Sequence, residues 1–150
     1  MGVQTYESIT KREDRFTKAV DTIVSGGGKC LIPVMTAHAQ ELLLILDEYW
    51  QNHPRLHQKV PTFYVSQMGE KALRVYQTFV NVMNSRISAL ADISNPFQYK
   101  HIRSVRHSAA IDESGPCVVF AGPGMLQNGV SRQICERLTT FFVLLYIIRS

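Results

Sequence analysis

Several features that define common protein classes are missing from this 150-residue sequence. The longest strictly apolar run, "FFVLLYII" from Phe141 to Ile148, is far shorter than the ~20 residues that a membrane-spanning helix needs. The amino terminus, "MGVQTYE", has no apolar core after a basic start and so does not resemble a secretory signal peptide. We therefore expect no membrane segment and no membrane partner.

The sequence contains few cysteines, and they form no short-spaced pair. The chain has three cysteines, Cys30, Cys117 and Cys135, and no two of them form a Cys-x-x-Cys motif. An odd number of widely spaced cysteines, each among aliphatic residues, is typical of buried free thiols in a reducing compartment. A disulfide-stapled scaffold is therefore not expected.

The short motifs of metal-dependent and nucleophilic enzymes are also missing. Neither His-x-His-x-Asp-His nor His-Glu-x-x-His occurs, and the closest histidine pair, His53 and His57, has Pro54 between its members. There is no Gly-x-Ser-x-Gly elbow, and no P-loop or Rossmann glycine fingerprint. Local motifs thus predict no catalytic residue and no metal ligand within this chain.

The composition that remains is that of a folded domain with a mixed architecture. Apolar residues make up 45% of the chain and charged residues 19%, with a net charge of +4 that is compatible with a polyanionic partner without requiring one. Short apolar runs alternate with amphipathic segments, which predicts an α/β fold with a mostly parallel sheet and helices on both faces. The expected strands are Cys30–Met35, Val60–Ser66, Phe97–Ile102 and Pro116–Ala121; the expected helices are Thr10–Ser25, Ala39–His53, Met68–Leu90 and one that begins near Ser131.

A glycine-rich turn, "AGPGMLQNGVSR", separates the strand at Pro116–Ala121 from the last helix. A turn of this kind exposes backbone N–H groups beside the positive end of a helix dipole, which favours an anion. Residues of the turn can then meet a phosphate and Arg132 can add charge, while Ser131 is expected to cap the helix. On local chemistry alone, a tight turn without any ligand explains the same residues.

Five segments in order, "GGGKCLIPV", "AQELLLILDEYWQNHPRLH", "VYQTFVNVMN", "NPFQYKHI" and "GPCVVFAGPGMLQNGVSRQI", resemble the β-CASP region of the metallo-β-lactamase-type RNA nucleases. Within that family they are most similar to the endonucleases that cut pre-mRNA at its 3′ end. The resemblance covers about residues 11–138, so we divide the chain into a partial β-CASP-like domain at 1–138 and a divergent apolar segment at 139–150.

The resemblance implies a Rossmann-like cap that holds RNA against a separate metallo-β-lactamase domain. That other domain would bind two zinc ions, so this chain alone would be inert and would carry no catalytic residue, metal ligand or cofactor. The implied partners are pre-mRNA, the metallo-β-lactamase domain and other cleavage and polyadenylation subunits, in the nucleus. The residues expected to contact RNA are Gly122, Pro123, Gly124, Met125, Ser131, Arg132 and, more weakly, His38.

Two departures from the family pattern leave alternatives open. Gln4 stands where the family has an acidic residue, and the loop "MTAHAQE" lacks the family's Gly-Arg pair, with His38 in the place of the arginine. A fixed positive charge is thereby exchanged for a titratable one. The alternatives are a non-catalytic scaffold subunit of the same processing complex and a free-standing nucleotide-binding α/β domain.

Overall fold

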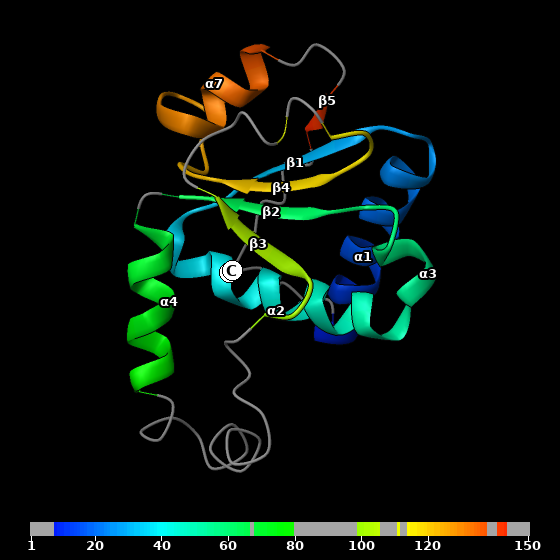
Figure 1. Ribbon diagram of the computed structural model, residues 1–150, viewed down its shortest axis with the longest axis horizontal. Helices are drawn as coiled ribbons and strands as arrows, with labels where there is room; N and C mark the ends of the chain where they lie inside the picture. Colours follow the sequence, from blue (N-terminus) through cyan, green and yellow to red (C-terminus); the bar gives the residue numbers. More distant parts are fainter. Residues whose placement is uncertain are drawn as a thin grey trace, which may run out of the picture.

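One parallel sheet lies at the centre of the computed structural model, which describes residues 8–66, 68–79, 99–105, 111, 114–137 and 141–143 (Figure 1). The strands are β1 (Lys29–Pro33), β2 (Thr62–Val65), β3 (Ile102–Val105), β4 (Val118–Ala121) and β5 (Phe141–Val143). The helices are α1 (Ile9–Ser25), α2 (Thr36–Asn52), α3 (Pro54–His57), α4 (Gly69–Thr78) and α7 (Gly129–Arg137). The strand order is β3-β2-β4-β1-β5, and each neighbouring pair is parallel, which confirms the predicted α/β class.

Both faces of the sheet are covered by helices. On one face, Ile32 and Phe120 pack with side chains of α1 and α2; on the other, Leu31 and Val119 pack with Ile134 of α7. Figure 1 shows α7 on one side of the sheet and α1, α2 and α3 on the other. Because successive strand residues point to opposite faces and both faces are buried, the central strands are apolar at nearly every position.

A buried hydrogen bond ties α2 to the sheet. The indole N–H of Trp50 donates to the hydroxyl oxygen of Thr62 across 2.9 Å, and both residues are fully buried. Trp50 is the largest of the buried side chains, so its one polar atom needs a partner inside the core. Thr62, the first residue of β2, supplies that partner and fixes where α2 lies on the sheet.

The strand predicted at Phe97–Ile102 lies later in the chain than expected. Strand β3 begins at Ile102, whose Cα pairs with that of Thr62. The residues before it are bonded to α2 instead: the His101 N–H donates to Asp47 Oδ1 at 2.9 Å, and the Tyr99 hydroxyl donates to the Gln40 carbonyl at 3.4 Å. These contacts hold residues 99–101 off the sheet, and no local pattern reveals them; residues 97 and 98 of the predicted strand lie outside the described ranges.

The prediction of buried free cysteines is confirmed for two of the three residues. Cys30 and Cys117 are buried free thiols, and Cys135 is a partly exposed one. Burial raises the pKa of Cys30 to about 12, so this thiol stays protonated at neutral pH. No helix among the described residues is long and apolar enough to cross a membrane.

Some predictions fall on residues outside the described ranges. These are Gln4, the part of the expected Met68–Leu90 helix beyond Phe79, and most of the segment 139–150. Within that segment, Phe141–Val143 forms strand β5 at the edge beside β1. The domain boundary at residue 138 stays a prediction.

We predict that Thr62→Val lowers the free energy of unfolding by about 1–3 kcal/mol, because the buried Trp50 N–H loses its acceptor while the side-chain volume is kept. Thr22→Val is the matched control. The Thr22 hydroxyl bonds only to the Lys18 carbonyl on the exposed surface of α1, so its loss should cost less than about 0.5 kcal/mol. Urea unfolding of the two variants measures the difference, and equal costs would contradict the assigned role of the buried bond.

Candidate nucleic-acid interface

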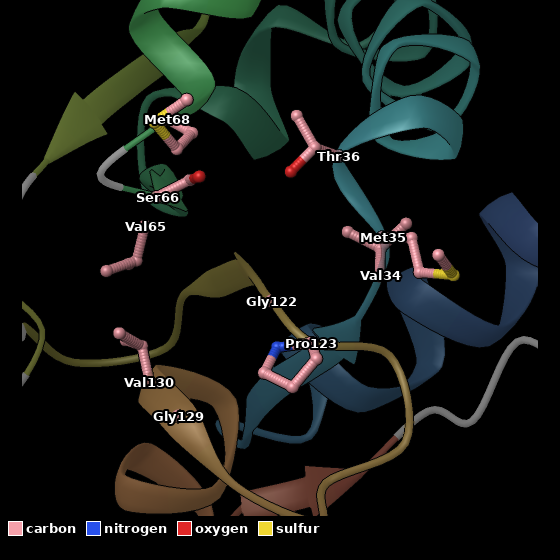
Figure 2. A pocket seen from close by; sticks show the side chains of 10 residues that line it. All are labelled: Val34, Met35, Thr36, Val65, Ser66, Met68, Gly122, Pro123, Gly129 and Val130. Atoms are coloured by element: carbon pink, nitrogen blue, oxygen red, sulfur yellow. The ribbon is translucent and has the colours of Figure 1, made fainter.

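Strands β1, β2 and β4 end side by side and form the floor of a pocket. Ala121, the last residue of β4, is in register with Pro33 of β1 on one side and with Val65 of β2 on the other. The segments that leave these three strands enclose a cavity of about 390 Å³ (Figure 2). It is lined by Val34, Met35, Thr36, Val65, Ser66, Met68, Gly122, Pro123, Gly129 and Val130.

The pocket lies where the chain leaves the sheet in two opposite directions. Helix α2 follows β1 and packs on one face, whereas α7 follows the adjacent strand β4 and packs on the other. In open parallel sheets, ligands bind outside the carboxyl ends of the strands at such a switch point. The sequence motif "AGPGMLQNG" therefore occupies the position where this architecture binds ligands.

Two of the turn's glycines are explained by packing within the chain. Gly129 has φ +75°, and a Cβ placed on it would lie 2.8 Å from the Pro123 Cδ. A Cβ on Gly122 would lie 3.3 Å from the Val34 carbonyl oxygen. Gly124 differs from both, because a Cβ there would meet its nearest neighbour, Met35, at an ordinary 3.6 Å. The glycines at 122 and 129 thus permit close approach of loop, strand end and helix, and need no ligand to account for them.

Ser131 secures the turn from inside and does not cap the helix, contrary to the sequence prediction. Helix α7 begins two residues earlier, at Gly129, and Ser131 is fully buried. Its N–H donates to the Gly122 carbonyl at 3.0 Å, and its hydroxyl donates to the Pro123 carbonyl at 2.7 Å. Since both donors are used within the protein and the residue has no exposed surface, we remove Ser131 from the expected RNA contacts.

Arg132 lies beside the same turn, and some of its N–H donors are already used in hydrogen bonds within the protein. Its Nε donates to Glu136 Oε1 at 2.6 Å and its Nη1 donates to the Gln127 carbonyl at 3.0 Å. The hydrogen bond to Glu136 and the charge of that carboxylate raise the pKa of Arg132. The side chain is 54% exposed, and a guanidinium has five N–H donors, so donors remain for a ligand in this part of the chain.

The middle of the turn leaves its main chain open. Gly124 and Met125 form a hydrogen-bonded turn, and the N–H groups of these two residues, Gln127 and Asn128 donate to no carbonyl within the described part of the chain, in contrast to the N–H of Ser131. The side chain of Met125 is 79% exposed, which places this segment at the surface. Helix α7 starts immediately after it and has no acidic residue in its first turn. A negatively charged group can therefore approach several backbone N–H groups and the positive end of the α7 dipole together.

The opposite wall of the pocket carries two hydroxyl groups that the sequence reading missed. Thr36 begins α2 and Ser66 follows β2, and Figure 2 shows their oxygen atoms turned toward each other on one side of the cavity. Burial raises the pKa of the nearby Tyr64 phenol, and its interactions with the hydroxyls of Ser66 and Thr36 partly offset the rise. Thr36 directly follows the expected strand Cys30–Met35, and Ser66 is the last residue of the expected strand Val60–Ser66, so the rule that strand ends gather at one edge is the signal that could have found them.

His38 lies apart from the pocket. His38 is exposed in the first turn of α2 and does not line the pocket. Among the described residues, no group of three or more histidine, cysteine, aspartate or glutamate side chains is arranged to hold a metal ion. The described part of the chain thus offers no ligand set for the zinc ions that the resemblance implies.

The comparisons with known proteins agree with the resemblance seen in the sequence. A family model described as the Beta-Casp domain matches residues 39–140. The chain is 52% identical over 137 residues to cleavage and polyadenylation specificity factor subunit 3 of Dictyostelium discoideum; the match covers 91% of the chain and 18% of that protein. It is 45% identical to cleavage and polyadenylation specificity factor 73 of Drosophila melanogaster, with 93% and 20% covered. It is also 45% identical to the endoribonuclease YSH1 of Mycosarcoma maydis, with 91% and 16% covered.

We predict that Gly129→Ala lowers the free energy of unfolding by about 2–4 kcal/mol, because a left-handed backbone and an overlap with the Pro123 ring both oppose the new methyl group. Two control variants separate these causes. Gly27→Ala has a similar φ of +80° and open space, and should cost about 1–2 kcal/mol. Gly115→Ala has neither constraint and should cost less than about 0.5 kcal/mol. Chemical denaturation of the three variants gives the comparison, and equal costs at 27 and 129 would show that the turn yields to the methyl group.

Proposed function

Because this chain belongs to the β-CASP family, we propose that it forms the RNA-holding cap of an endoribonuclease that acts in pre-mRNA cleavage and polyadenylation. The observation that carries the proposal is the set of N–H groups without a carbonyl partner at Gly124, Met125, Gln127 and Asn128, at the carboxyl edge of the sheet. The chain spans 16–20% of the length of these relatives, so the remaining parts of such an enzyme lie elsewhere.

The turn binds the sugar-phosphate backbone without regard to sequence. Backbone N–H groups donate to phosphate oxygens, the α7 dipole adds a partial positive charge, and Arg132 contributes its remaining N–H donors. Gly124 and Met125 belong to the open part of the turn, whereas Gly122 and Pro123 form its base and line the pocket. Contacts of this kind fix the position and direction of an RNA strand.

A polymer suits this edge better than a dinucleotide cofactor. Dinucleotide sites of the Rossmann type use an acidic side chain to bind the ribose hydroxyl groups. The residues that line the present pocket include no aspartate or glutamate, and the open amides extend along a surface turn. RNA is therefore the preferred ligand, and a free nucleotide is the alternative that the titration below tests.

Cleavage belongs to other parts of the complete protein. The described residues provide no metal ligand set, so we assign no catalytic step to this chain and expect it to bind RNA without cutting it. Two zinc ions on a metallo-β-lactamase domain would activate water and stabilise charge on the scissile phosphate. We expect the complete protein to act in the nucleus with other cleavage and polyadenylation subunits.

The titration that tests this proposal compares a short labelled RNA with labelled ATP by fluorescence anisotropy. We expect saturable RNA binding that weakens as salt rises, because counterions are released from the phosphates, and no comparable affinity for ATP. Tight ATP binding without RNA affinity would overturn the proposal in favour of a nucleotide-binding domain. RNA affinity that is unchanged between low and moderate salt would contradict the phosphate contacts.

Charge changes beside the turn should move RNA affinity in opposite directions. Glu136→Gln removes a carboxylate that engages Arg132, and should strengthen RNA binding by about 2- to 5-fold at low salt. Arg132→Gln should weaken binding by a similar factor. Glu48→Gln, an exposed position on α2 that does not line the pocket, makes the same change in net charge and is the matched control. An equal gain in RNA affinity from Glu48→Gln would show that the effect comes from net charge alone.

A further inference from the structure

We propose that the pocket beside the glycine-rich turn accepts a single unstacked nucleobase of the bound RNA. The proposal rests on the proposed function, because it assigns the base to the same strand whose phosphates lie on the turn. It adds a second kind of contact to that site, since phosphate contacts position a strand while base contacts distinguish sequences.

The lining of the pocket suits an uncharged aromatic ring and not a phosphate. None of the lining residues has a charged side chain. The side chains of Val65, Val130 and Pro123 form apolar walls, and Figure 2 shows Met68 and Met35 on opposite sides of the cavity. Apolar walls and polarisable thioethers make favourable contacts with the face of an aromatic ring. A phosphate placed here would lose its hydration without gaining a cation.

The polar atoms of the pocket are gathered on one wall, where they can meet the edge of a base. The Thr36 and Ser66 hydroxyl oxygens face each other there (Figure 2), and each interacts with the buried Tyr64 hydroxyl. A hydroxyl both donates and accepts, so an interaction with Tyr64 does not exhaust the hydrogen-bonding capacity of Thr36. Tyr64, which is buried and interacts with both hydroxyls, is assigned the role of a positioning residue.

The pocket and the open amides are one continuous surface. Gly122 and Pro123 line the pocket, and the open N–H groups begin at the next residue, Gly124. A strand whose phosphates contact residues 124–128 therefore passes the mouth of the cavity. Met35 and Met68 line the pocket from opposite sides and are 61% and 62% exposed, so a base in the cavity would cover apolar surface that now faces water.

The first measurement compares RNA with and without bases. Short oligouridylate, oligoadenylate and an abasic ribose-phosphate oligomer of equal length are titrated into the chain. We expect the better homopolymer to bind about 5- to 100-fold more tightly than the abasic oligomer, which is the range for one stacked base. Equal affinity for all three, with salt-dependent binding retained, would overturn the base pocket and leave the proposed function intact. No RNA binding at all would overturn both.

A second measurement locates the base. Methyl labelling of methionine gives separate nuclear magnetic resonance signals for Met35 and Met68, and the exposed Met125 of the turn serves as an internal comparison. We expect ring-current shifts at Met35 and Met68 with base-bearing RNA and none with the abasic oligomer. Shifts confined to Met125 would overturn the proposal. The same pattern produced by free uridine or adenosine monophosphate at equal concentration would assign the pocket to a mononucleotide instead.

A matched pair of variants tests the hydroxyl wall. Thr36→Val removes one pocket hydroxyl and keeps the branched shape, whereas Thr78→Val does the same near the far end of α4, where the hydroxyl bonds only to the Arg74 carbonyl. We expect Thr36→Val to change the affinity ratio of oligouridylate to oligoadenylate by about 5-fold or more while abasic affinity stays constant. An unchanged ratio in Thr36→Val, or an equal change in Thr78→Val, would overturn the assigned role.

Discussion

The parallel pairing of β4 with both β1 and β2 is the constraint on which the candidate site depends. The three strands run in the same direction, and Ala121 is in register with Pro33 and Val65. The segments that follow these strands therefore leave the sheet at the same edge. Segments that are about 30 and 60 residues apart in sequence become neighbours around one cavity. A shift of register in either pair would exchange the two faces of a strand and move its following loop away from the others.

The glycine-rich turn combines two structural roles that its sequence does not separate. Gly122 and Gly129 allow close packing, and the buried Ser131 bonds twice to the base of the turn. These internal contacts hold the main chain while N–H groups in the middle of the turn stay open. Rigid anchorage of the ends keeps the cost of ordering low when a ligand binds, since little conformational entropy remains to be lost.

Membership of the β-CASP family and the chemistry of the described residues point to a division of labour. The relatives are endoribonucleases and cleavage factor subunits five to six times as long as this chain, and the residues described here offer backbone amides, hydroxyls and apolar walls in place of metal ligands. Under the proposed function, such groups bind and orient a nucleic acid, and the metals that the resemblance implies would act on an RNA that the cap has positioned.

The sequence alone determined the α/β class, the existence of the two buried strands observed at Lys29–Pro33 and Val118–Ala121, and the place of the glycine-rich turn, because apolar runs and glycines are local signals. Tertiary structure alone decided the later start of β3, which follows from bonds between His101 and Asp47. It also buried Ser131 and brought Thr36 and Ser66 together over Tyr64. Each of these depends on which distant segments become neighbours in the sheet, and that information is carried by strand pairing and not by any short stretch of residues.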